Sequence, residues 1–161
     1  MQINFKRQSS LVALGWLFLA AAACSRTEPA TGISGEAPQS SSGRAVLANE
    51  PDSKWPSDPL TISNASVAGD TLVVAVEHGG GCATHTYQLV VSRAWMESLP
   101  VQVAARVSHD AHGDLCKALI RRELRFSLTP VAETYRAAYG QPHGTVSIRL
   151  AGSSAELLYS F

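Results

Sequence analysis

The chain has 161 residues, of which 45% are hydrophobic and 16% charged, and its 13 Lys and Arg balance its 13 Asp and Glu. This length fits a single domain of ordinary size. The zero formal charge argues against a nucleic-acid partner, because a phosphate-binding surface needs clustered Lys and Arg.

The N-terminus has the parts of a signal peptide. Lys6 and Arg7 form a basic start, and an apolar run over residues 11–23 leads to Cys24. This run is shorter than the roughly 20 residues that a helix needs to cross a bilayer. One interpretation is ordinary secretion with cleavage after Ala23. The other is lipid attachment, because small residues directly before a cysteine resemble the bacterial lipobox, in which that cysteine is lipidated and becomes the first residue of the mature chain.

We favour lipidation at Cys24, which makes the membrane a partner through the lipid anchor. Several acyl chains on one residue give an anchorage that a single chain does not. By resemblance to lipoproteins of two-membrane bacteria, Ser25 after the cysteine favours the outer membrane of the cell envelope. Residues 24–59 are rich in Ser, Gly, Pro and Ala, and such segments bury too little surface to fold. The sequence therefore predicts a signal peptide over 1–23, a lipidated Cys and flexible tether over 24–59, and a folded domain over 60–161.

Alternation of apolar and polar residues recurs through this folded domain. It predicts seven strands, which lie within residues 60–66, 72–76, 87–91, 101–107, 124–128, 146–150 and 157–161. One polar and one apolar face is typical of antiparallel sheets. A helix is expected with Thr129 as its cap, Pro130 at its first position and Gly140 at its end. We predict an all-β fold class: an immunoglobulin-like antiparallel β-sandwich of about seven strands with one short helical connection.

The folded domain keeps two cysteines, Cys82 and Cys116, and an even number in an exported chain favours a disulfide. The alternative is a thiolate metal site, in which His85 and His109 would join the two sulfurs. We favour the disulfide, because an oxidising compartment removes thiolates before a metal binds them.

A sulfur-free metal site stays open beside the disulfide. Its candidate ligands for copper or zinc are His85, His109 and His112, with Asp110 or Asp114 as an oxygen donor. His109 has the inward parity of the strand that precedes it, so its imidazole is expected at the buried end of the domain, where it needs a partner. No other cofactor is expected.

Catalysis is not expected either. A Cys–His dyad would need a reduced thiol, and residues 25–161 contain no G-x-S-x-G, H-E-x-x-H or S-x-x-K motif. The pattern GGC-x-x-H at 80–85, HD at 109–110 and D-x-C at 114–116 resembles small uncharacterised bacterial lipoproteins. The resemblance implies an all-β domain with paired cysteines and carries no activity. We therefore predict a non-enzymatic binding module of the cell envelope, whose partner is an envelope protein or a glycan; the alternative is a metal-binding envelope lipoprotein.

Overall fold

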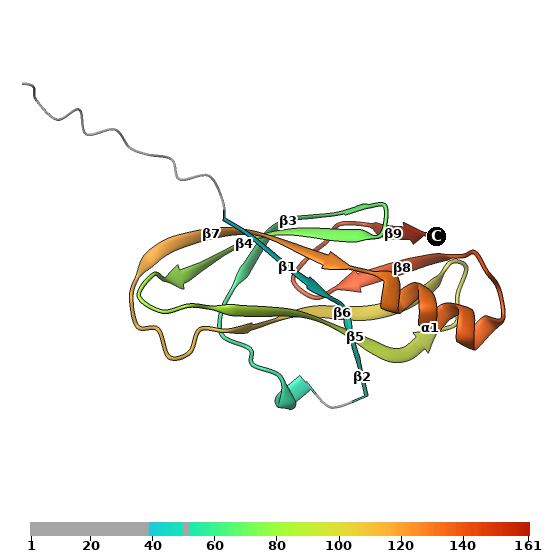
Figure 1. The fold of residues 1–161 in the computed structure, drawn as a ribbon, viewed down its shortest axis with the longest axis horizontal. Helices are drawn as coiled ribbons and strands as arrows, with labels where there is room; N and C mark the ends of the chain where they lie inside the picture. Colours follow the sequence, from blue (N-terminus) through green and yellow to red (C-terminus); the bar gives the residue numbers. More distant parts are fainter. Residues whose placement is uncertain (1–38, 50–51) are drawn as a thin grey trace, which may run out of the picture. The chain divides into compact units, whose positions relative to one another are not determined.

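A computed structural model describes residues 39–49 and 52–161 (Figure 1). These residues form nine strands, one 3-10 turn and one α-helix. Their bounds are β1 Gln39–Arg44, β2 Val46–Ala48, η1 Asp52–Lys54, β3 Thr61–Ala68, β4 Thr71–Gly80, β5 Thr86–Met96, β6 Val101–Asp110, β7 Ala118–Ser127, α1 Thr129–Tyr139, β8 Thr145–Leu150 and β9 Leu157–Ser160.

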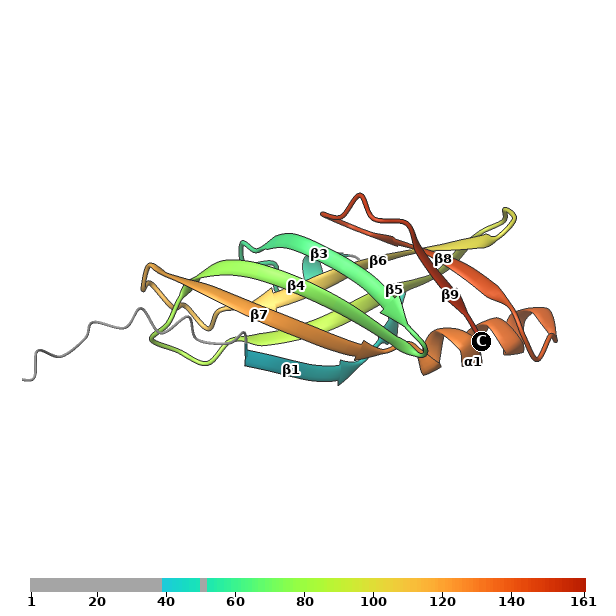
Figure 2. The ribbon, with the colours of Figure 1, turned by 90° about the horizontal axis from the view of Figure 1, so that it is seen from above.

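The strands build two sheets. The first has the strand order β1-β7-β4-β3, and the second has the order β2-β5-β6-β8-β9 (Figure 2). The predicted all-β class and its single helix are confirmed. The seven strands predicted within residues 60–161 are present as β3 to β9, and β1 and β2 lie before them in the segment predicted as a tether. One detail of the prediction is corrected: three pairs, β1/β7, β2/β5 and β6/β8, are parallel where antiparallel pairing was expected. Both sheets are therefore mixed, because period-two alternation identifies a strand without saying which neighbour it pairs with or in which direction.

The core lies between the two sheets and follows the alternation. In β4 every second side chain is buried, beginning with Leu72, and the facing side chains come from the other sheet. Among the fully buried side chains is Tyr159 of β9, whose hydroxyl donates to Asp70 Oδ1 at 2.7 Å. Burial of one large apolar side chain stabilises a fold by about 1.5–3 kcal/mol, so this core supplies most of the stabilisation.

The segment predicted as a tether is partly folded, which corrects the boundary at residue 60. Ser- and Gly-rich β1 pairs in parallel with β7, and Ala45 is buried and donates its N–H to the Ser127 carbonyl at 3.0 Å. Further along, the Pro56 carbonyl accepts a hydrogen bond from Ser108 Oγ at 2.8 Å. A strand needs backbone partners more than apolar side chains, so composition alone does not exclude one. The predicted signal peptide and Cys24 lie outside the described residues.

Helix α1 lies at one end of the sandwich and packs Val131 and Ala132 into the core (Figure 1). It ends as predicted at Gly140, which adopts φ +65° and donates its N–H to the Arg136 carbonyl at 2.9 Å. The predicted cap is corrected, because Leu128 occupies the N-cap position and Thr129 is the first helical residue. Within the described residues, no helix has the length and apolar character needed to cross a bilayer.

Candidate functional site

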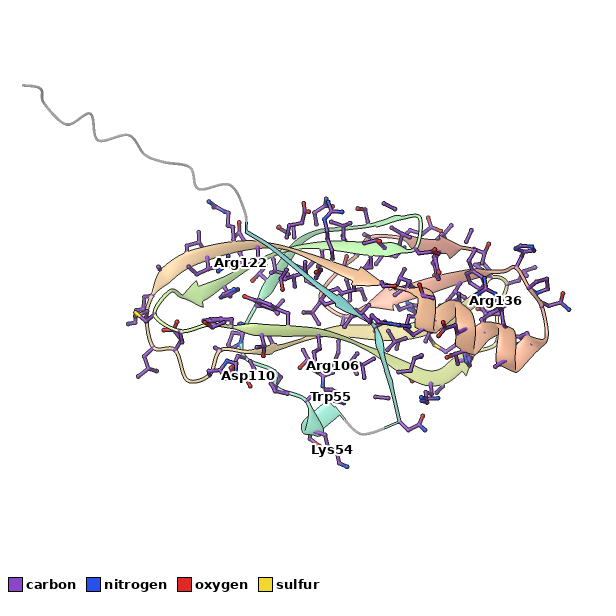
Figure 3. The ribbon with its side chains drawn as sticks, in the orientation of Figure 1. Lys54, Trp55, Arg106, Asp110, Arg122 and Arg136 are labelled. Atoms are coloured by element: carbon purple, nitrogen blue, oxygen red, sulfur yellow. A yellow bond between two sulfur atoms is a disulfide. The ribbon has the colours of Figure 1, made fainter. Side chains whose placement is uncertain are left out.

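The end of the sandwich opposite α1 carries a disulfide bond, drawn in yellow in Figure 3. There the chain crosses from the first sheet to the second between β4 and β5, and returns between β6 and β7. The two crossings are joined by the Cys82–Cys116 disulfide, whose Cα atoms are 5.9 Å apart. The predicted disulfide is confirmed, and the thiolate metal site is excluded because both sulfurs are used in the bond.

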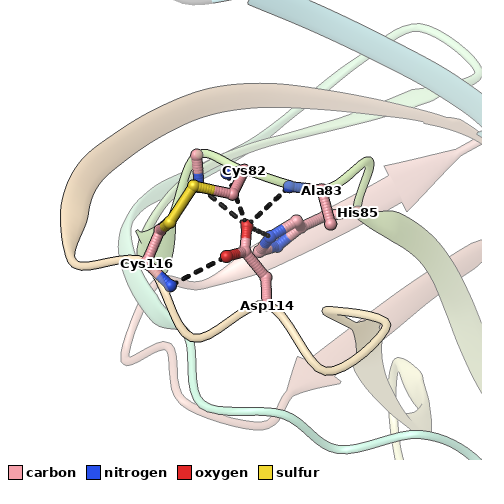
Figure 4. The surroundings of a disulfide bond; sticks show 6 residues. Cys82, Ala83, His85, Asp114 and Cys116 are labelled. Atoms are coloured by element: carbon pink, nitrogen blue, oxygen red, sulfur yellow. Dashed lines mark hydrogen bonds and ion pairs between the residues drawn. A yellow bond between two sulfur atoms is a disulfide. The ribbon is translucent and has the colours of Figure 1, made fainter.

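Asp114 holds the two crossing loops together from inside (Figure 4). Its Oδ2 accepts the backbone N–H groups of Gly81, Cys82 and Ala83, each at 2.9 Å, and its Oδ1 accepts the N–H of Cys116 at 2.9 Å. Successive N–H groups converging on one oxygen form an anion-binding nest. The N–H groups of Cys116 and Ala83 contribute most to holding the pKa of the Asp114 carboxyl well below its usual range. The Asp114 side chain is therefore ionised, and both of its oxygens are used in hydrogen bonds within the protein.

Gly80 provides the space that this arrangement needs. Its φ is +144°, a region that residues with a Cβ rarely adopt. A Cβ built there would lie 2.6 Å from the His85 ring atoms Cε1 and Nε2, and 3.1 Å from Asp114 Oδ2. Glycine at this position allows the imidazole and the carboxylate to meet over the backbone.

Three imidazoles and a phenol lie close together at this end of the sandwich. His85 contacts Asp114 Oδ2 through Nε2 at 3.2 Å and His109 Nε2 through Nδ1 at 2.8 Å. His78 contacts the Tyr87 hydroxyl through Nε2 at 2.5 Å. The ring centroids of the three imidazoles are 4.5–5.0 Å apart. We call His78, His85 and His109 the histidine cluster.

The cluster is shielded from water. The exposed fraction is 5% for His78 and 1% for His109, and the side chain of His85 is 5% exposed. Burial lowers the pKa of His78 and His109, because it penalises the charged imidazolium, while the backbone carbonyls that they contact oppose this effect. Burial likewise raises the pKa of the Tyr87 phenol.

The structure changes the membership of the predicted ligand set. It brings His85 and His109 together as predicted, but His112 and Asp110 lie outside the cluster and contact each other at 3.8 Å with about half-exposed side chains. Sequence reasoning missed His78. It had a usable signal, because His78 continues the inward parity of Leu72, Val74 and Val76 along β4.

A hollow of about 740 Å³ lies elsewhere, on the five-stranded sheet. It is lined mostly by small side chains of β5, β6, β8 and the following turn, among them Ala94, Ala104 and Ser147. No member of the histidine cluster lines it. We place the candidate site at the histidine cluster, because titratable and metal-ligating groups converge there.

Comparison with known proteins finds likeness in fold alone. No protein-family model matches the chain, and no curated protein matches its sequence. A NigD-like immunity protein from Bacteroides caccae superposes with a TM-score of 0.50 at 18% identity, over 70% of this chain and 52% of that protein. The chain thus spans about half the length of that protein. A proposed lipoprotein from Bacteroides fragilis superposes with a TM-score of 0.50 at 8% identity, over 76% of this chain and 68% of that protein. At these identities the likeness concerns the fold alone, so function is argued from the site.

Proposed function

We propose that this chain is a lipid-anchored protein of the bacterial cell envelope, whose β-sandwich serves as a non-enzymatic binding domain. The observation that carries the proposal is the Cys82–Cys116 disulfide. Disulfides form and persist in oxidising compartments, and a structural bridge fits export by the basic and apolar N-terminus before Cys24. One solved structure with this fold is described as a proposed lipoprotein, which is consistent with this location.

A binding role is favoured over catalysis by the way the site uses its polar groups. Asp114 accepts four backbone N–H groups and the His85 ring. The imidazoles of His78 and His109 are buried, and both ring nitrogens of each face another group of the protein. A general acid or base must reach a substrate proton, and these rings are turned toward the protein instead. The partner that we propose is an envelope protein or a glycan of the same compartment.

The anchor is tested by fractionation of bacterial cells that express the full chain. We expect the wild type in the membrane fraction and Cys24→Ala in the soluble fraction, because removal of the lipidated residue removes the anchorage. Cys82→Ser is the matched control, since it also removes one cysteine but leaves Cys24 in place, and it should remain with the membranes. A Cys24→Ala protein that still sediments with the membranes would overturn the proposed anchor.

A further inference from the structure

We propose that His78, His85 and His109 bind one transition-metal dication of the class to which Zn²⁺ and Cu²⁺ belong. One ligand nitrogen from each of the three residues lies within 4.8 Å of the others. Imidazole is the donor that these ions accept most readily in proteins, apart from thiolate. The site is independent of the proposed anchor and of the binding role.

The outer ring nitrogens already have the partners typical of metal-bound histidines. Metal-ligating imidazoles usually donate their second N–H to a carboxylate or a backbone carbonyl. Here His78 Nδ1 lies 2.8 Å from the Gly79 carbonyl, and His109 Nδ1 lies 3.1 Å from the Asp58 carbonyl. The Nε2 of His85 likewise lies 3.2 Å from Oδ2 of the Asp114 carboxylate. These oxygens only accept hydrogen bonds, so the proton of each neutral imidazole belongs on its outer nitrogen.

The inner nitrogens are then left with lone pairs that face one another. His85 Nδ1 and His109 Nε2 are 2.8 Å apart, and two lone pairs at that distance repel unless a cation lies between them. In His78 the Nδ1 proton points to the Gly79 carbonyl, which leaves Nε2 as the third ligand nitrogen, and this atom now accepts the hydroxyl proton of Tyr87. Nitrogens bound to one tetrahedral zinc ion at about 2.1 Å lie about 3.4 Å apart, so ring movements on the order of 1 Å convert the cluster into a metal site.

An extra proton is the competing cation. A proton shared by His85 and His109 would satisfy their two inner nitrogens and would be balanced by the negative charge of Asp114. It cannot join His78 to the pair, whereas one metal ion can bind all three imidazoles. The Tyr87 oxygen, beside His78, offers a fourth ligand. At His78 the negative charge of the Asp114 carboxylate opposes the positive charge of Arg122.

The fold presents the three ligands on a rigid frame. His78 lies on β4 in one sheet, His109 lies on β6 in the other, and His85 directly precedes β5. The Cys82–Cys116 bridge and the Asp114 nest fix the loop that carries His85. Ligands held by strands and a crosslinked loop lose little freedom on metal binding, which favours affinity.

The test uses the untagged full chain, isolated in detergent, stripped with a chelator and titrated with Zn²⁺ or with Cu²⁺ alone. We expect one ion per chain by elemental analysis after gel filtration. Replacement of His78, His85 or His109 by Gln should weaken binding by about tenfold or more. His112→Gln and His143→Gln are the controls, because these are the two other histidines of the chain, and they should bind as the wild type does.

A second measurement covers variants that fail to fold. In wild-type protein, nitrogen NMR of the histidine rings should show Zn²⁺ shifting one nitrogen in each ring of the cluster and leaving His112 and His143 unchanged. The proposal is overturned if the stripped protein binds far less than one ion per chain, if the loss of binding follows His112→Gln or His143→Gln, or if the NMR spectrum shows a shared proton that excess metal does not displace.

Discussion

Asp114 explains why the residues of the GGC-x-x-H and D-x-C patterns occur together. Its carboxylate accepts the N–H groups on both sides of the disulfide as well as the ring of His85. A buried carboxylate without such donors would be costly, and here each oxygen is satisfied. The residues of these two patterns are thus needed to build the loops around Asp114. The same contacts hold the His85 ring, and with it the histidine cluster, in place.

Gly80→Ala should destabilise the domain more than Gly113→Ala. Both glycines have positive φ, +144° and +72°, so both substitutions strain the backbone by about 1–3 kcal/mol. A Cβ at position 80 also collides with the His85 ring, whereas a Cβ at position 113 meets nothing within 4 Å. Urea denaturation should show the larger loss of unfolding free energy for Gly80→Ala, and equal losses for the two variants would contradict the close packing of His85 against the loop.

Some residues of the site can be predicted from the sequence, and others cannot. His85 and His109 could be singled out because each lies near a cysteine. His78 could have been found from its inward parity, yet a histidine at the end of an apolar strand gives no distinct signal by itself. The predicted ligand set includes His112 and Asp110, which follow His109 closely in the sequence, but the chain turns at His112, with φ +50°, and the His112 side chain stays about half-exposed. The role of Asp114 was hidden, because most of its partners are backbone N–H groups.

At the scale of the elements, the disulfide bridges the two loops that cross between the sheets. Its cysteines are separated by 34 positions, and closing a loop of that size stabilises a fold by about 4 kcal/mol in the chain-entropy model. We expect no free thiol at Cys82 or Cys116 in denatured, unreduced protein, and a lower melting temperature after reduction.

Cys82→Ser, Cys116→Ser and the double variant should lower the melting temperature by similar amounts, because either single change already removes the crosslink. Thiol titration and calorimetry check both statements. Two reactive thiols at these positions in untreated protein, or a melting temperature that reduction leaves unchanged, would show that the bridge is not what stabilises this end of the sandwich.

Strand β1 is not predicted because its Ser and Gly residues carry no alternation, and β2 is not predicted because its three apolar residues are too short a run to show one. Their positions depend on backbone hydrogen bonds to the exposed edges of β7 and β5, which become available only when the sandwich has formed. The same limit applies to the parallel pairing of β6 with β8, since periodicity does not encode a partner. Strands β3 to β9 are readable from the sequence because apolar and polar residues alternate along them.

A chain that begins at residue 60 should be less stable than one that begins at residue 35. The shorter chain loses β1 and β2 and the contacts of Pro56 and Asp58 with β6. Two sheet edges are then exposed, which also favours aggregation. Thermal melting monitored by circular dichroism, with light scattering for aggregation, compares the two chains. Equal melting temperatures would mean that residues 39–59 add nothing to the folded domain.

For the whole molecule, the arrangement of the two sheets gathers the chemistry at one end. Because the chain changes sheets twice at that end, residues from β4, β5, β6 and both crossing loops meet there, far apart in sequence but close in space. The alternation of apolar and polar residues predicts a sandwich and the faces that it buries. The contact between the His78 and His109 rings depends on the order of the strands, which the sequence does not reveal.

The metal site is tested most directly by anomalous X-ray diffraction from crystals of the protein grown with Zn²⁺, measured on both sides of the zinc absorption edge. We predict one strong anomalous peak per chain within about 2.1 Å of a ring nitrogen of each of His78, His85 and His109. The outer nitrogens should keep their contacts with the Gly79 carbonyl, the Asp114 carboxylate and the Asp58 carbonyl. Peaks confined to exposed side chains such as His112, with the cluster unchanged, would contradict the assignment.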